Sequence, residues 1–358
     1  MKGDIMTKEA LCWWTKISGA KNLLEKTVSR LLEERHTAIH HGTSQTWEEE
    51  FRENVMQQVQ EESGLRCFLP LNIKETGADI GKYLFEHYCP EERQNRFALK
   101  EGYAKFIAAE CGPSIGDYYI WIYGIDKKAE DDKVMDFVAE YSDSPSKYEK
   151  AVFIVESSYK GKKKGRKNIG VLEQESKITQ YDMALYAMEL LNDSRLKGDT
   201  RQYIAELAAN ISGADPKVCV SCIEHAQEIL TNPESGILQA IADAGTAAIP
   251  DREKLRKQIW EAQIRVFYPT VETERLELVN KYRKQIERQL PARMPFGEIV
   301  NEADMAELGM LKSMKDTAKL IVEPDDAKRI DTLWSIRNAL AHLKILEDVS
   351  ALSGNRRL

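Results

Sequence analysis

The sequence has no long apolar run and little cysteine for its length. Its 358 residues include six cysteines, scattered along the chain, whereas a disulfide-stabilised secreted domain is smaller and richer in cysteine. The first ten residues are polar and charged and do not resemble a signal peptide. The longest apolar stretches, at 118–123 and 151–155, are too short to cross a bilayer. These absences predict a cytoplasmic protein with free thiols and no membrane association.

A complete phosphate-binding loop is also missing. Such a loop reads G-x-x-x-x-G-K-[ST] between a strand and a helix. The corresponding stretch, 42–47, has neither the second glycine nor the lysine, so ordinary ATP hydrolysis and a bound cofactor are not expected. The predicted elements nevertheless follow the order helix, short strand, loop, helix, and a later strand ends in an acidic residue, Asp126 or Glu156. This order resembles that of a degenerate P-loop ATPase domain. That resemblance implies a nucleotide-sensing region, and the alternative is a plain α/β scaffold.

Neither sign of charge dominates the composition. The 51 lysines and arginines against 58 aspartates and glutamates give a net charge of -7, which does not suit a protein that coats nucleic acid but allows a local basic patch. A dense basic loop at 159–168 is the one strong positive cluster, and its alternative role is that of a solvated connection between two strands. Its candidate nucleic-acid contacts are Lys162, Lys163, Lys164, Arg166 and Lys167.

Residues 1–175 alternate between helical and strand patterns. The periodicity predicts a helix over 7–35 with a break at Ser18-Gly19, and further helices at 47–61, 80–87, 91–110 and 133–141. The strongest strand, at 151–157, is continuously apolar, as is typical of a strand buried on both faces. This alternation predicts an α/β domain with a mostly parallel sheet. The strands are expected at 37–40, 66–73, 117–125, 151–157 and 169–173.

After residue 175 the sequence shows only helical patterns. One helix start is marked by Asp215-Pro216, with aspartate as the cap and proline in the first turn. The chain is therefore expected to continue as a helical middle region, 176–245, and a helical domain, 246–358. The expected helices lie at 181–192, 200–211, 216–230, 252–290, 303–314 and 325–352.

The last predicted helix contains the motif Arg337-Asn338-x-x-x-His342. Arginine, a polar residue, three further residues and then histidine is the defining pattern of the HEPN superfamily, and this copy has the common Arg-Asn form. Residues 250–352, about a third of the chain, therefore resemble a HEPN domain. The resemblance implies a HEPN-like helical bundle with Arg337, Asn338 and His342 in the position of the catalytic, RNA-cleaving site.

These residue types suit RNA cleavage without a metal. Asn338 and His342 are four apart and share a helix face, and Arg337 lies about 100° around the helix from Asn338. A histidine suits the proton transfers to and from the ribose oxygens. An arginine suits the charge on the phosphate, and the asparagine can orient either group. The apolar residues expected to face neighbouring helices are Ile330, Leu333, Trp334, Leu340 and Leu343.

One copy of the motif corresponds to half of a HEPN ribonuclease site, because two such helices usually meet in one cleft. The resemblance therefore implies an RNA substrate, a 2′,3′-cyclic phosphate product, and a homodimer or a HEPN-bearing or regulatory protein partner. It also fits the effector of a bacterial toxin or anti-phage defence system, with the N-terminal domain as regulator. The alternative is a non-catalytic assembly or sensor subunit of a multi-protein defence complex.

Two other groups of residues contain side chains that can bind metals. His40 and His41 end a predicted strand, where α/β folds place ligands, but adjacent strand residues point to opposite faces of the sheet. Cys219, Cys222 and His225 share one side of a predicted helix, but a structural zinc needs four ligands. The sequence therefore predicts no metal site.

Overall fold

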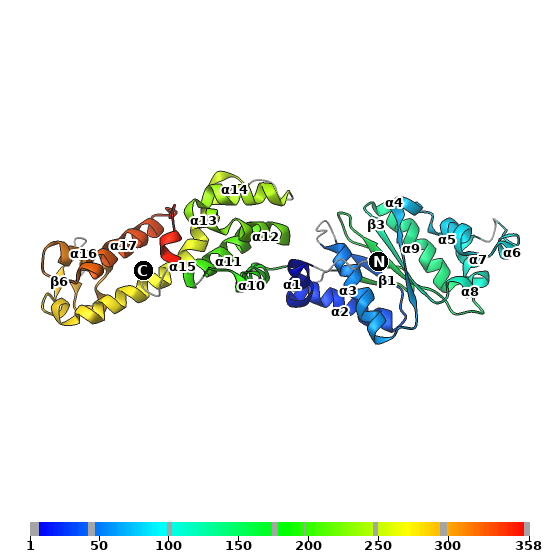
Figure 1. The fold of residues 1–358 in the computed structure, drawn as a ribbon, viewed down its shortest axis with the longest axis horizontal. Coiled ribbons are helices and arrows are strands. Elements are labelled where there is room, and N and C mark those ends of the chain that lie inside the picture. Colours follow the sequence, from blue (N-terminus) through cyan, green and yellow to red (C-terminus); the bar gives the residue numbers. More distant parts are fainter. Residues whose placement is uncertain are drawn as a thin grey trace. The chain divides into compact units, whose positions relative to one another are not determined.

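The chain forms two compact units, Met1–Ile178 and Thr179–Leu358 (Figure 1). The structure is a computed structural model, and it describes residues 7–41, 47–98, 102–173, 178–196, 198–245, 250–293 and 299–353. The boundary lies close to the end expected for the α/β domain at residue 175. Residues 176–245 and 246–358, expected as separate regions, fall in the same unit.

The N-terminal unit is built on a five-stranded sheet in the order β2-β3-β4-β1-β5. All four strand pairings are parallel, which agrees with the predicted parallel α/β domain. All six residues of β4 are buried, because the strand is central and packed on both faces. The strands are β1 (Thr37–His40), β2 (Cys67–Asn72), β3 (Tyr118–Ile125), β4 (Val152–Ser157) and β5 (Gly170–Glu173).

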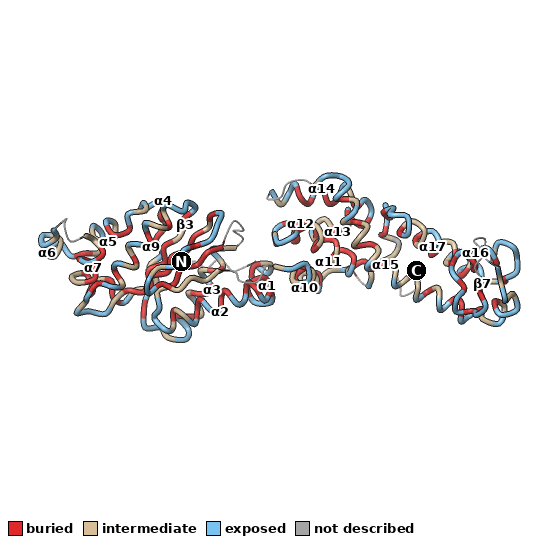
Figure 2. The backbone as a smooth tube through the Cα atoms, turned by 180° about the vertical axis from the view of Figure 1, so that it is seen from behind, coloured by how far each residue is buried: buried red, intermediate tan, exposed pale blue. Residues whose placement is uncertain are grey.

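Helices cover both faces of this sheet, and the buried residues in Figure 2 follow the strands between them. Alternate residues of β3 pack on opposite faces, as the pleat requires. Ile120 and Ile122 belong to the core under one set of helices, while the ring of Trp121 lies 6.2 Å from that of Phe51 on the other side. One face carries α1 (Lys8–Lys16), α2 (Ser18–Leu32) and α3 (Glu48–Glu62); the other carries α5 (Ile80–Tyr88), α7 (Tyr103–Glu110) and α9 (Lys128–Asp143).

The predicted helix boundaries agree with the structure where strong helix-breaking residues mark them, and they differ elsewhere. The break predicted near Ser18-Gly19 is present, because Ile17 is extended between α1 and α2. The single helix predicted at 91–110 is wrong: its ends form the separate short helices α6 (Glu91–Gln94) and α7, and residues 99–101 lie outside the described chain. The remaining short helices are α4 (Ile73–Thr76) and α8 (Gly112–Ile115).

The prediction that all cysteines are free thiols is wrong for one pair. Cys89 ends α5 and Cys111 ends α7, and their Cα atoms lie 5.3 Å apart with the two sulfurs bonded. The pairing arises because α5 and α7 pack side by side and bring together residues 22 positions apart. Among the described residues, Cys12, Cys67, Cys219 and Cys222 are not part of a disulfide.

The described residues of the C-terminal unit are helical apart from one very short antiparallel strand pair, β6 (Ala292–Arg293) with β7 (Ile299–Val300), which the sequence did not predict. The helix α15 (Arg252–Glu287) runs through Pro269 and packs first against α11 and then against α17. The predicted start at Asp215-Pro216 is confirmed, since the Asp215 carboxylate accepts a hydrogen bond from the backbone N–H of Lys217. The other helices are α10 (Gln180–Leu190), α11 (Gly198–Ser212), α12 (Pro216–Glu224), α13 (Ala226–Thr231), α14 (Pro233–Ala244), α16 (Leu308–Asp316) and α17 (Pro324–Ala341).

The described part of this unit also contains three single turns of 3₁₀ helix: η1 (Leu191–Asp193), η2 (Ala303–Met305) and η3 (Ser350–Ser353). Within the described parts of both units, no helix combines the length and the apolar character needed to span a bilayer.

Candidate functional site

The helix α17 carries Arg337 and Asn338, the first two residues of the Arg-Asn-x-x-x-His motif, and packs against α15 and α16. Ile330, Leu333 and Leu340 are buried in this packing, as predicted. The same prediction is wrong for Trp334 and Leu343, whose side chains are 36% and 71% exposed. Leu343 comes after the end of the helix and has a positive φ of 56°, so helical spacing no longer decides where it points.

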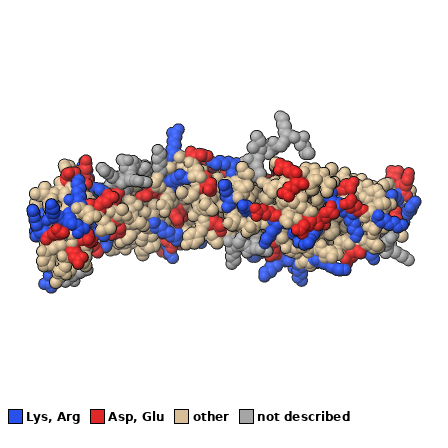
Figure 3. Space-filling model, turned by 90° about the horizontal axis from the view of Figure 1, so that it is seen from below, with Lys and Arg blue, Asp and Glu red and all other residues tan. Residues whose placement is uncertain are grey.

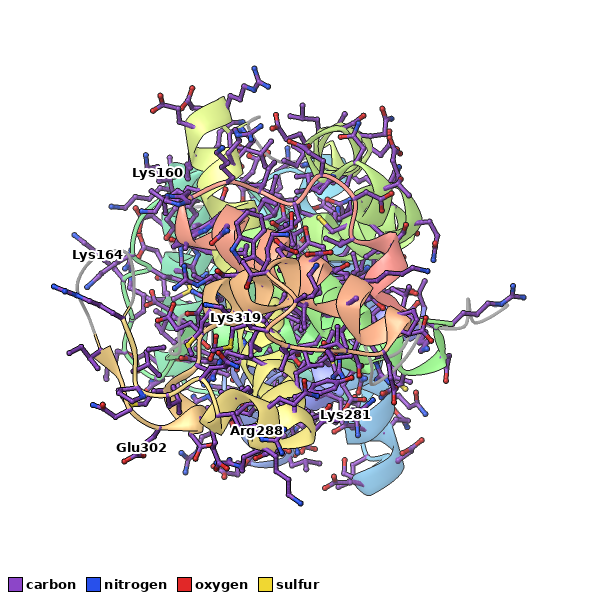
Figure 4. The ribbon with its side chains drawn as sticks, turned by 90° about the vertical axis from the view of Figure 1, so that its left-hand side faces the viewer. Lys160, Lys164, Lys281, Arg288, Glu302 and Lys319 are labelled. Atoms are coloured by element: carbon purple, nitrogen blue, oxygen red, sulfur yellow. A yellow bond between two sulfur atoms is a disulfide. The ribbon has the colours of Figure 1, made fainter. Side chains whose placement is uncertain are left out.

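Arg337 and Asn338 line a groove with a volume of about 620 Å³. The groove has apolar walls from Met310 and Met314 on α16, and Trp334 lies beside the motif. Lys319, which follows α16, also lines it and is labelled in Figure 4. Cationic and amide side chains beside apolar walls form a surface that can hold a ligand with both a phosphate and a flat ring.

Among the described residues, the partners of the Arg337 guanidinium in this groove are weak. One of its nitrogens lies 3.3 Å from the carboxylate of Glu307, and another lies 3.5 Å from the amide oxygen of Asn338. The Glu307 side chain is 66% exposed, so the ion pair contributes roughly 0–1 kcal/mol. A phosphate oxygen could therefore displace this carboxylate at little cost.

His342 lies just outside the helix rather than within it. The expectation of a helix over 325–352 is wrong, since α17 ends at Ala341 and His342 is its exposed capping residue. Its backbone N–H still bonds to the carbonyl of Asn338, at 3.1 Å, but its side chain does not line the groove. The structure therefore brings Arg337 and Asn338 together in one groove and places His342 at the adjoining helix end.

Contacts with α15 fix the place where α17 ends. The indole N–H of Trp260 donates to the carbonyl of Leu340 at 2.7 Å. The side chain of Gln263, fully buried, donates to the carbonyl of Leu346 at 2.8 Å and accepts from its N–H at 2.7 Å. These bonds hold the chain on both sides of His342, so the exposed imidazole sits on an anchored backbone.

The basic loop at 159–168 is only partly a surface patch. Lys163 was predicted to contact nucleic acid, but its side chain is fully buried and its ammonium lies 2.6 Å from the carboxylate of Asp131. That prediction is wrong for Lys163, because the loop folds back so that this lysine reaches the ends of β4 and α9. Lys162 and Lys164 are exposed, and Lys160 and Lys164 are labelled in Figure 4.

Arg166 and Lys167, also predicted to contact nucleic acid, form ion pairs with acidic residues of α9. Arg166 lies 2.9 Å and 2.6 Å from the carboxylates of Asp132 and Asp136, and Lys167 lies 3.0 Å from that of Asp143. Across the face shown in Figure 3, basic and acidic side chains are interspersed in the same way. The loop thus offers nucleic acid fewer unpaired cations than its composition suggests.

A second polar cluster lies at the carboxyl ends of β1 and β4. The two strands are neighbours, and the chain leaves β1 towards β2 and leaves β4 towards β5, in opposite directions across the sheet. Open α/β sheets bind ligands at such a point. Residues 42–46, most of the stretch compared with a phosphate-binding loop, lie outside the described residues, so that comparison stays a prediction.

The centre of this cluster is the buried carboxylate of Glu156. It accepts hydrogen bonds from the imidazole of His41 at 3.2 Å, the guanidinium of Arg52 at 3.0 Å and the indole of Trp121 at 2.6 Å. Burial is the largest influence on this carboxyl and opposes its ionisation, but the hydrogen bonds from His41 and Trp121 and the charges of His41 and Arg52 together hold the pKa of Glu156 below its usual value. Glu156 is therefore an ionised group inside the fold.

The neighbouring histidine, His40, points to the opposite side of the sheet from His41. Its ring lies 2.8 Å from the carbonyl of Gly161 and 3.4 Å from the hydroxyl of Ser157. The two histidines therefore do not share a ligand position, as the alternation of strand side chains predicts. Cys219 and Cys222 are buried, and His225 is paired with Asp243 at 3.0 Å.

Comparisons with known proteins add little to this geometry. The sequence matches no protein-family model and no curated protein. Among solved structures, one described as "Structure of Rhizobiales Trip13" is similar over 67% of this chain and 83% of that chain, with 14% sequence identity and a TM-score of 0.31. A TM-score this low supports no statement about the fold or function of the present chain.

Proposed function

We propose that this chain is a metal-independent endoribonuclease of the HEPN type, with Arg337, Asn338 and His342 as one half of its active site. The observation that supports the proposal most directly is the position of Arg337 and Asn338 at an open groove, with an exposed His342 at the end of the same helix. None of the three is sealed in a core by strong ion pairs. The motif residues are therefore placed where an RNA strand could reach them.

Each residue has a role that its chemistry and surroundings support. The guanidinium of Arg337 binds the scissile phosphate and stabilises the charge that builds up on it, after displacing the exposed Glu307. The imidazole of His342 transfers protons at the ribose 2′-hydroxyl or the leaving 5′-oxygen. Asn338 orients the guanidinium, whose nitrogen lies 3.5 Å from its amide oxygen. The product is expected to carry a 2′,3′-cyclic phosphate.

A second half-site is needed, because one histidine cannot act as both base and acid on opposite sides of the phosphate in one step. His342 does not line the groove that holds Arg337 in the same chain. In a symmetric dimer, the histidine of one copy could approach the arginine of the other across the two-fold axis. A HEPN-bearing or regulatory partner protein would serve the same purpose, and a toxin or anti-phage defence effector is the setting that fits such an arrangement.

The proposal is tested by incubating the purified full chain with single-stranded RNA in excess EDTA. Cleavage products ending in a 2′,3′-cyclic phosphate are expected. Arg337→Ala and His342→Gln should each abolish cleavage. Two matched controls should retain it: Lys328→Ala, an exposed cation on α17, and Lys344→Ala, an exposed cation two residues after His342.

Two outcomes would count against the proposal. Equal cleavage by the Arg337→Ala and His342→Gln proteins would show that the activity comes from another site or a contaminant. Absence of cleavage from the wild-type chain, alone and mixed with proteins encoded beside it, would favour the non-catalytic assembly subunit. Glu307→Gln adds a finer check: because it releases the guanidinium of Arg337, cleavage should be unchanged or faster.

A further inference from the structure

Near the carboxyl ends of the strands, the carboxylate of Glu48 has a buried oxygen without a hydrogen-bond partner among the described residues. Glu48 lies in the first turn of α3, where its charge suits the helix N-terminus. Its oxygen Oε1 is buried, and no described group forms a hydrogen bond with it. A buried, unpaired carboxylate oxygen is costly, so its presence calls for a ligand or another explanation.

This oxygen belongs to a compact group of three potential metal ligands. A nitrogen of His41, a carboxylate oxygen of Glu48 and a carboxylate oxygen of Glu156 all lie within 4.8 Å of one another. The ligand atoms of a tetrahedral zinc site are roughly 3.4 Å apart, given bonds of about 2.0–2.1 Å. The three side chains therefore need to move inwards by only about an ångström to share one ion.

The charges in this cluster also favour a cation. Glu156 is ionised and is paired with Arg52, but Glu48 faces the same negative charge without an ion pair among the described residues. Burial, and then the charge of Glu156, raise the pKa of the Glu48 carboxyl above its usual value, against the smaller opposing effects of the charges of His41, Arg52 and Lys74. A bound cation would offset the repulsion between Glu48 and Glu156, and it would also coordinate the unpaired oxygen of Glu48.

We propose that His41, Glu48 and Glu156 bind a divalent transition-metal ion, with zinc as the best match. One imidazole nitrogen and two carboxylate oxygens form a mixed donor set that suits zinc better than the all-oxygen sites of magnesium or calcium. Three protein ligands leave a fourth position open for water or for a ligand. The site lies in the N-terminal unit and is independent of the proposed ribonuclease residues in the C-terminal unit.

The groups that would orient the metal-binding side chains are already in contact with them. The indole of Trp121 donates to one oxygen of Glu156, leaving the other oxygen, which contacts His41 and Arg52, on the side of the cluster. Hydrogen bonds of this kind fix the orientation of metal-binding carboxylates. The ring of Phe51 lies 5.4 Å from the ring of His41 and limits how far that imidazole can turn.

The test is calorimetric titration of zinc ions into the full chain after removal of metals with a chelator. The wild-type chain should bind one zinc ion at this site, and Glu48→Gln and His41→Gln should each weaken that binding by at least about tenfold. Glu49→Gln, which removes an equal charge from the exposed neighbouring position on α3, should leave the affinity unchanged. Manganese and magnesium ions serve as comparison probes, with magnesium expected to bind more weakly.

Thermal unfolding of the same proteins gives a second readout, in which Glu48→Gln has opposite effects on stability without and with zinc. Without metal, Glu48→Gln should be as stable as the wild type or more so, because it removes the repulsion with Glu156. With saturating zinc, the wild type should gain stability and the variant should not. Absence of zinc binding by the wild type, or unchanged binding by Glu48→Gln, would overturn the proposed site.

Discussion

His36 should make the N-terminal unit sensitive to mild acid. Its ring is largely buried beside Tyr141 and Phe153, and its Nδ1 accepts a hydrogen bond from the backbone N–H of Phe153 at 3.0 Å. Burial, followed by the charges of Lys150 and Arg66, lowers the pKa of His36 from 6.5 to about 4. Protonation would also put an N–H against the N–H of Phe153, so the folded state holds the neutral ring.

The size of the effect follows from the two pKa values. Because the folded pKa is lower, the unfolded chain takes up the proton first as the pH falls. The stability that neutral His36 contributes is fully present above pH 6.5 and is lost as the pH falls towards about 4. At about 1.4 kcal/mol for each pKa unit, the full loss is roughly 3 kcal/mol, of which about 2.5 kcal/mol is lost by about pH 4.5.

The assay compares urea unfolding of the wild type and His36→Asn near pH 7.5 and near pH 4.5. An asparagine oxygen can take the place of Nδ1 as acceptor for Phe153 but does not titrate. Between the two conditions, the wild type should lose about 2.5 kcal/mol more than the variant. His87→Asn, at an exposed histidine, should behave like the wild type. Parallel losses in the wild type and His36→Asn, or an NMR titration of His36 near 6.5, would refute the reasoning.

Two further predictions concern buried polar side chains. Gln263→Leu should destabilise the C-terminal unit by about 2–4 kcal/mol, because the N–H and the carbonyl of Leu346 both lose their partner. Urea unfolding should show this loss of stability, and amide hydrogen exchange at Leu346 should become faster. The control Gln227→Leu, at an exposed glutamine, should leave the stability unchanged. Lys163→Ala should cost about 3–5 kcal/mol in thermal or urea unfolding, because it leaves the Asp131 carboxylate buried without its cation. Lys164→Ala, at the adjacent exposed lysine, should change stability by less than about 0.5 kcal/mol, and equal effects of the two lysine variants would contradict the burial argument.

Local patterns in the sequence were sufficient for much of the fold. The apolar run at 151–157 predicted a central strand, and β4 occupies Val152–Ser157 with every residue buried. Asp215-Pro216 predicted a helix start that the Asp215 side chain caps. These features were predictable because strand alternation, helix periodicity and capping depend on residues a few positions apart.

The candidate sites were predictable only in part. The Arg337-Asn338-x-x-x-His342 pattern can be read directly from the sequence, but the end of α17 before His342 depends on Trp260 and Gln263, about 80 residues earlier. Lys163 resembles its basic neighbours in sequence, and only the fold of its loop onto Asp131 shows that it is internal. Helical spacing assumed a continuous helix, so it also misplaced Leu343.

The sequence by itself determined the division between an α/β part and a helical part, and the presence of the helix that carries Arg337 and Asn338. The tertiary structure alone decided the contacts between distant positions: the Cys89–Cys111 pair, the buried Lys163, and the meeting of His41 with Glu156, 115 residues further along the chain. The reason is physical. Which strand lies beside β1 is set by the packing of the whole sheet, and no local pattern of residues specifies that order.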